Sequence, residues 1–138
     1  MPTARIDKLE PRRIYFCTCT VIEWIDIFTK PVYFQILADS LRYCRRHKGL
    51  LLYGYVFMTN HIHLMFSAAH PHTPDAFLRD FKKWTTRAIA QELGNESRQY
   101  IPNLLRKTIF KNKNNQIQIW QPGNYAEGVE SESFLFRN

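Results

Sequence analysis

The sequence contains no apolar run that approaches the ~20 residues needed to span a bilayer. Met1 to Arg13 carries charges but lacks the apolar stretch of a signal peptide. Cysteine is scarce and odd in number, with only Cys17, Cys19 and Cys44, and no Cys-x-x-Cys pair occurs. These absences argue against a membrane span and a disulfide framework, and they predict a cytoplasmic protein with reduced thiols.

Positive charge is in excess. The chain has 19 Lys and Arg against 12 Asp and Glu, a formal net charge of +7 and a pI of about 9.5. This balance favours a polyanionic partner, but it does not choose between DNA, RNA and an acidic membrane. Aromatic residues make up 14% of the chain, and they can either fill a core or stack on unpaired bases.

Hydrophobic spacing predicts four strands and two helices. In chain order these are a strand at Ile14–Val21, a helix with an apolar stripe at Tyr33, Leu37, Leu41 and Cys44, strands at Leu50–Phe57 and His61–Phe66, a helix with a stripe at Phe77, Phe81, Trp84 and Ala88, and a strand at Ile117–Trp120. This order is typical of a ferredoxin-like α+β fold, an antiparallel sheet with helices packed on one face. We expect one domain over residues 1–138.

Capping and turn residues set the expected ends of these elements. Thr29 is the predicted N-cap of the first helix and Gly49 its end, and Thr73 and Gly94 bound the second helix in the same way. Met58–Asn60 is too short for anything but a tight β-hairpin turn. The weaker pattern beyond Gly94 suggests a short helix at Ile101–Leu105 and a loop at Lys111–Gln116.

The most distinctive local feature is a His-x-His pair in the third predicted strand. Because strand side chains alternate, His61 and His63 share one face, about 7 Å apart at ~3.3 Å per residue. Ile62 and Leu64 then belong to the core. Two imidazoles on one strand suit a divalent metal that takes a third ligand from elsewhere. Two ordinary histidines on an exposed face are the alternative.

A basic stripe runs along the second predicted helix. Spacings of three and four place Arg79, Lys82, Lys83 and Arg87 broadly on one side. Such a stripe can follow a phosphate backbone, but it can equally be a solvated helix face.

Tyr55–Leu64, with its His-Ile-His core, resembles the signature hairpin of the single-tyrosine HUH transposases. This family includes insertion-sequence transposases and REP-associated tyrosine transposases. Three further segments resemble the family's first strand, its DNA-contacting helix and its tryptophan segment: Ile14–Thr20, Phe81–Thr85 and Ile119–Tyr125. The resemblance extends from about Arg13 to the end of the chain.

The resemblance implies a mobile-element enzyme that cuts and rejoins single-stranded DNA beside a DNA hairpin. In the family a tyrosine hydroxyl attacks the phosphodiester, which leaves a 5′-phosphotyrosine and a free 3′-hydroxyl. His61 and His63 would hold Mg²⁺ or Mn²⁺. Asn60 would orient the site, and Lys82 and Lys83 would contact phosphates. Together with Arg79 and Arg87 of the basic stripe, these three are the expected DNA-binding residues. The expected partner is single-stranded or hairpin DNA, and a homodimer is left open.

One departure concerns the nucleophile. The family's tyrosine lies on a helix after the tryptophan segment, in a Tyr-Ile-x-x-Asn-Pro-like stretch. No tyrosine follows Tyr125, and Tyr125 belongs to the preceding segment, where it substitutes poorly. We therefore expect the catalytic helix, and the third metal ligand that often comes from it, to be missing. The chain should then bind DNA without forming a covalent adduct.

Two alternatives remain at this point. A non-catalytic module with the same sheet could bind single-stranded nucleic acid through the same basic and aromatic residues. A histidine-triad nucleotide hydrolase is disfavoured, because Leu64-Met65-Phe66 supplies no third alternating histidine.

Overall fold

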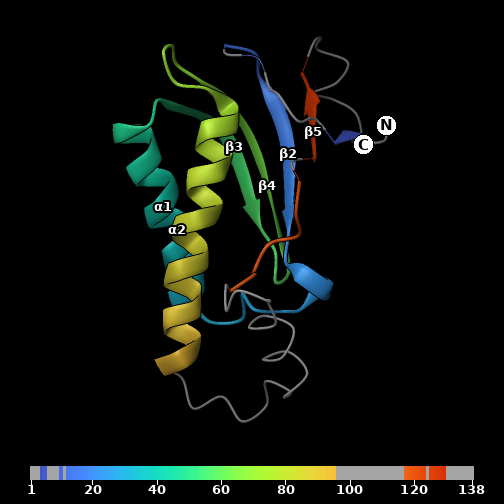
Figure 1. The fold of residues 1–138 in the computed structure, drawn as a ribbon, viewed down its shortest axis with the longest axis vertical. Coiled ribbons are helices and arrows are strands. Elements are labelled where there is room, and N and C mark those ends of the chain that lie inside the picture. Colours follow the sequence, from blue (N-terminus) through green and yellow to red (C-terminus); the bar gives the residue numbers. More distant parts are fainter. Residues whose placement is uncertain (1–3, 6–9, 11, 96–116, 124, 130–138) are drawn as a thin grey trace.

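The computed structural model describes residues 4–5, 10, 12–95, 117–123 and 125–129. Its elements are β1 (Ala4–Arg5), β2 (Tyr15–Thr20), the 3₁₀ turn η1 (Ile22–Trp24), α1 (Pro31–His47), β3 (Leu50–Phe57), β4 (His61–Ala68), α2 (Pro74–Asn95) and β5 (Tyr125–Gly128). The sheet order is β1-β5-β2-β4-β3, and every pairing is antiparallel. Both helices cover one face of this sheet (Figure 1). The predicted α+β fold is confirmed.

The core lies between that sheet face and the two helices. Alternate residues of β2 and β4 are buried there, among them Cys17, Ile62 and Phe66. The ring of Phe66 lies 5.0 Å from that of Phe77 on α2. Burying a large apolar side chain stabilises a fold by roughly 1.5–3 kcal/mol, so this face holds the sheet and helices together. No helix in the described part of the chain is long and apolar enough to cross a membrane.

The β3–β4 hairpin forms as the sequence predicts. The Met58 amide donates to the His61 carbonyl at 2.8 Å and closes a tight turn. β4 continues two residues beyond the predicted end, to Ala68. β3 is an edge strand, and its pairing with β4 shifts between Leu52 and Gly54. This irregularity bends β3 near its middle.

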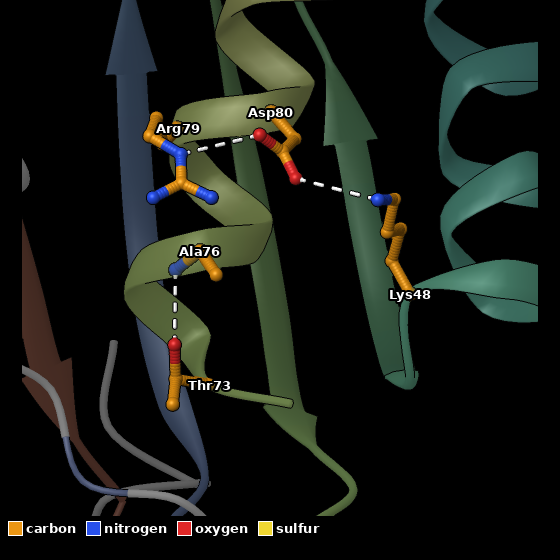
Figure 2. A network of polar contacts seen from close by, with 5 residues as sticks. All are labelled: Lys48, Thr73, Ala76, Arg79 and Asp80. Carbon is orange, nitrogen blue, oxygen red and sulfur yellow. Dashed lines mark hydrogen bonds and ion pairs between the residues drawn. The ribbon is translucent and has the colours of Figure 1, made fainter. Parts of the chain in front are cut away.

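The ends of the helices agree only in part with the prediction. The Thr73 hydroxyl accepts a bond from the Ala76 amide at 3.2 Å and caps α2 as expected (Figure 2). Thr29 is not the cap of α1, because the N-cap is Lys30, which makes no side-chain capping bond. Gly49 follows α1 with φ +67°, a conformation that favours glycine. Gly94 does not end α2, which continues to Asn95.

The buried face of α2 also differs from the predicted stripe. Phe77 and Phe81 are buried, whereas Trp84 and Ala88 are only partly buried. The fully buried positions further along α2 include Thr85 and Ile89, so the buried stripe is rotated from the predicted one.

The last strand lies later in the chain than predicted. Ile117–Trp120 makes only one bridge, between Trp120 and Val21, and the strand that pairs with β2 is Tyr125–Gly128. Trp120 is buried, and its indole N–H donates to the Thr85 hydroxyl at 2.9 Å. This stretch therefore packs into the core and does not form a long β-ladder. The helix predicted at 101–105 and the loop predicted at 111–116 lie outside the described residues.

Candidate metal and DNA site

The two histidines lie on a central strand, on the sheet face opposite the helices. β4 is flanked by β2 and β3, and His63 pairs with Thr18 on one side and Val56 on the other. Because Ile62 is buried under the helices, its neighbours in β4 point to the opposite face. The two imidazole centroids are 4.9 Å apart. The predicted pair therefore converges as the strand pattern required.

Both imidazoles are held through the same ring nitrogen. His61 Nδ1 lies 2.8 Å from the Asn60 side-chain oxygen, and His63 Nδ1 lies 2.9 Å from the Thr18 hydroxyl. The Asn60 amide nitrogen donates to the Trp24 carbonyl at 3.2 Å. This bond turns the Asn60 oxygen toward His61, so Nδ1 carries the proton and Nε2 keeps its lone pair. Such hydrogen bonds orient histidines for a metal.

The environment of His63 favours its neutral form. Burial lowers the pKa of His63 below its ordinary value, and the neighbouring His61 lowers it further. The ring of Phe16 stacks on it, with the centroids 5.3 Å apart. A neutral imidazole is the form that binds metal.

His61 and His63 are two candidate nitrogen ligands, but a third candidate protein ligand is not found among the described residues. In that part of the chain no group of three or more His, Cys, Asp or Glu side chains could hold an ion. The donor set still fits a divalent metal with open positions, because both rings are oriented by a hydrogen bond at Nδ1 and the His61 Nε2 atom keeps its lone pair.

All four residues of the predicted basic stripe line one groove. Its volume is about 620 Å³, and α2 forms one wall and residues 117–123 the other. Its basic lining residues are Arg79, Lys82, Lys83 and Arg87. Lys82 donates to the Gly123 carbonyl at 2.8 Å and ties the two walls together. Arg79 bonds Asp80 at 3.2 Å, and Asp80 also pairs with Lys48 at 3.8 Å (Figure 2).

The groove and the histidine pair lie on different sides of the sheet, and they are connected at the end of β2. The groove is lined by α2 and residues 117–123, whereas the histidines point away from the helix layer. Between them the Gln121 amide donates to the Thr20 carbonyl at 2.8 Å, and Thr20 pairs with His61. The groove and the histidines are therefore connected across the end of β2.

Tyr125, the weak candidate for the nucleophile, lies on a strand. It begins β5 and pairs with Thr18, which in turn pairs with His63. Its backbone is thus in the same cross-strand row as His63, two strands or about 10 Å away at ~4.8 Å per strand.

Trp24 is the residue that the sequence reasoning missed. It is 62% exposed although it is the bulkiest kind of side chain, and its φ is +56° beside Glu23 at +57°. Such angles are uncommon outside glycine and cost of order 1–3 kcal/mol each. The bond from Asn60 to the Trp24 carbonyl links this strained turn to His61. Neither the strain nor the link is visible in the sequence, where Trp24 merely follows a strand.

Comparisons with known proteins agree with the resemblance seen in the sequence. Residues 15–134 match the family model described as "Transposase IS200 like". A solved structure of a REP-associated tyrosine transposase bound to a REP hairpin is similar at 14% identity and a TM-score of 0.64, over 98% of this chain and 66% of that one. A Deinococcus radiodurans protein provisionally assigned as a transposase is similar at 18% identity and a TM-score of 0.61, over 98% and 91% of the two chains.

A search of curated proteins finds no match. The chain spans slightly less than two thirds of the hairpin-bound transposase, and at these identities the solved structures support the shared fold alone. The family match is broader evidence, because it covers most of the sequence, including the histidine pair and the basic helix. The chain therefore belongs to the IS200-like transposase family.

Proposed function

We propose that this chain binds single-stranded DNA beside a DNA hairpin and presents a phosphodiester to a divalent metal held by His61 and His63. The observation that carries the proposal is the oriented pair of imidazoles, whose Nδ1 atoms are both hydrogen-bonded. The groove of basic residues beside the end of β2 supports a polyanionic partner. The similar protein that is bound to a REP hairpin supports the choice of DNA hairpin.

Different residues of the chain would bind the metal, the phosphates and an unpaired base. The Nε2 atoms of His61 and His63 would hold Mg²⁺ or Mn²⁺, and Asn60 and Thr18 keep the rings in place. When bound, the metal would polarise a phosphate oxygen and offset charge that develops during phosphoryl transfer. Lys83 and Arg87 are exposed in the groove and would contact phosphates. The exposed indole of Trp24 offers a stacking surface for an unpaired base near the histidines.

Binding and cleavage are separate parts of this proposal. Cleavage in the family's manner would form a bond between a tyrosine oxygen and phosphorus and break the bond from phosphorus to the 3′-oxygen, which leaves as a hydroxyl. A nucleophile must approach to about 3–3.5 Å. Because the Tyr125 backbone lies two strands from His63, we propose that this chain binds DNA without covalent capture.

A denaturing gel tests the covalent part. Labelled hairpin DNA with a single-stranded flank is incubated with the chain and Mn²⁺, then denatured. We expect no protein–DNA band. A band that is lost in Tyr125→Phe would assign the nucleophile to Tyr125 and contradict this part of the proposal.

Fluorescence anisotropy tests the binding part. We expect hairpin DNA with a single-stranded flank to bind more tightly than a blunt duplex of the same length, with a log–log salt slope of roughly −0.7 per phosphate contacted on the single strand. Lys83→Ala should weaken binding to all sequences alike and flatten the slope by about one contact. Equal affinity for the flanked hairpin and the duplex at moderate salt would refute the preference.

A further inference from the structure

A second basic concavity lies on the other side of the helix layer, and the proposed function does not use it. Its volume is about 560 Å³, and it forms where the end of α1 meets the edge strand β3. Its lining residues are Arg42, Arg45, Arg46, Leu50, Leu51, Leu52 and Tyr53. None of these residues is acidic, so the concavity is suited to an anion.

The three arginines converge from one side of α1. Their spacing of three and four residues places Arg42, Arg45 and Arg46 on neighbouring turns. Arg42 is paired with Asp39 at 2.9 Å. Arg45 and Arg46 are exposed and have no carboxylate partner among the described residues. Basic residues at a helix C-terminus also complement the helix dipole, but that role does not require a concavity.

Tyr53 gives the concavity an aromatic wall. The side chain is 56% exposed on the edge strand, at the place where the pairing with β4 shifts between Leu52 and Gly54. Arginines beside an exposed aromatic ring form the combination that binds single-stranded nucleic acid, since guanidinium groups contact phosphates and the ring stacks on a base.

The concavity is also within reach of the histidine pair. His63 pairs with Val56 on β3. Tyr53 lies three residues before Val56 on the same strand, about 10 Å from it along β3 at ~3.3 Å per residue. A single strand that leaves the histidines over the β3 edge would meet Tyr53 and then the arginines.

We propose that this concavity binds an unpaired arm of the DNA beyond the hairpin, with its phosphates on Arg45 and Arg46 and a base on Tyr53. The inference rests on the proposed function, since the DNA must first be held at the groove and the histidines. It assigns the unpaired arm to the β3 edge of the sheet, apart from the basic groove beside α2 and residues 117–123.

The test compares two fluorescent DNAs that share one hairpin, of which only one carries an unpaired arm of about ten nucleotides, within the range of a single-stranded site. We expect the arm to raise the affinity of the wild-type chain about fivefold or more. Arg45→Gln/Arg46→Gln should abolish this gain and change the affinity for the armless hairpin less than about twofold. The matched control Lys83→Gln/Arg87→Gln, which also removes two charges, should weaken both DNAs.

A third variant separates stacking from charge. Tyr53→Ala should reduce the gain from the arm, whereas Tyr53→Phe should retain it. An unchanged gain in the double arginine variant, or an equal loss on both DNAs, would overturn this inference alone. If the wild-type chain bound neither DNA, the proposed function would fail together with it.

Discussion

Asn60 connects two parts of the site through one side chain. Its oxygen accepts from His61 and its nitrogen donates to the Trp24 carbonyl, so the histidine and the strained turn hold each other in place. The sequence predicted Asn60 as an orienting neighbour, and the structure supplies the partner that fixes its direction. Whether Asn60 also contacts DNA stays a prediction.

Replacing Asn60 tests this connection. Asn60→Ala removes the bond that holds the His61 ring, and we expect Mn²⁺ affinity to fall about 10- to 100-fold in calorimetric titrations. Asn60→Asp is the matched control, because its carboxylate still accepts from His61 although it cannot donate to Trp24. Unchanged Mn²⁺ affinity in Asn60→Ala would show that the bond does not orient a ligand.

Replacing Trp24 tests whether the exposed indole in the strained turn binds DNA. A stacked base is worth about 1–3 kcal/mol, so Trp24→Ala should weaken binding of single-stranded DNA about five- to 150-fold. Trp24→Phe should keep part of this affinity, and Mn²⁺ binding should stay unchanged in both variants. Because φ is +56°, Trp24→Gly should also be more stable to urea than Trp24→Ala, by about 1–2 kcal/mol. Wild-type DNA affinity in Trp24→Ala would remove the residue from the proposed site.

Among the elements, α2 and residues 117–123 are joined inside the core as well as across the groove. The Trp120 indole donates to the Thr85 hydroxyl, and that hydroxyl donates to the Phe81 carbonyl at 2.7 Å. Both side chains are buried, so the bond cannot be replaced by one to water. This contact holds the two walls of the basic groove at a fixed separation.

Thr85→Val should therefore destabilise the chain by about 1–3 kcal/mol in urea denaturation, because the valine keeps the shape but leaves the indole N–H unsatisfied. The double variant Thr85→Val/Trp120→Phe should lose less stability than the sum of the losses in the two single variants. Thr85→Ser retains the hydroxyl and serves as the control. A Thr85→Val chain as stable as the wild type would contradict this account of the groove.

The elements that the sequence predicted well are those with local signals. The β3–β4 hairpin and the N-terminus of α2 follow from strand alternation, a three-residue turn and Thr73, all read within a short window. The position of β5 could not be read in this way, because it depends on pairing with β2, which is distant in the sequence. Trp120 belongs to an apolar run that resembles a strand, but its side chain packs in the core beside Thr85.

In the candidate site, too, the sequence predicted the features that depend on one segment and missed those that depend on packing between segments. The shared face of His61 and His63 follows from alternation in one strand. The Thr18 and Phe16 contacts to His63 required the register of β2 against β4, and the arginine concavity required the contact between α1 and β3. These depend on tertiary packing, which the periodicity of one segment does not encode.

Across the whole molecule, the sheet separates a helix-covered face from the face that carries the histidines (Figure 1). The basic groove lies beside α2 and residues 117–123, and the arginine concavity lies where α1 meets the edge strand β3. A single strand that runs from one to the other across the open face passes His61 and His63. The proposed function therefore depends on these two histidines holding a metal.

Titration with Mn²⁺, followed by the electron paramagnetic resonance of the free ion, tests that claim most directly. The wild-type chain should bind Mn²⁺ with modest affinity, since water fills most of the coordination positions, and hairpin DNA with a single-stranded flank should tighten it. The matched control His47→Ala/His70→Ala, which removes two exposed histidines, should behave like the wild type. His61→Ala/His63→Ala should lose the site, and equal Mn²⁺ binding by this variant and the wild type would contradict the account.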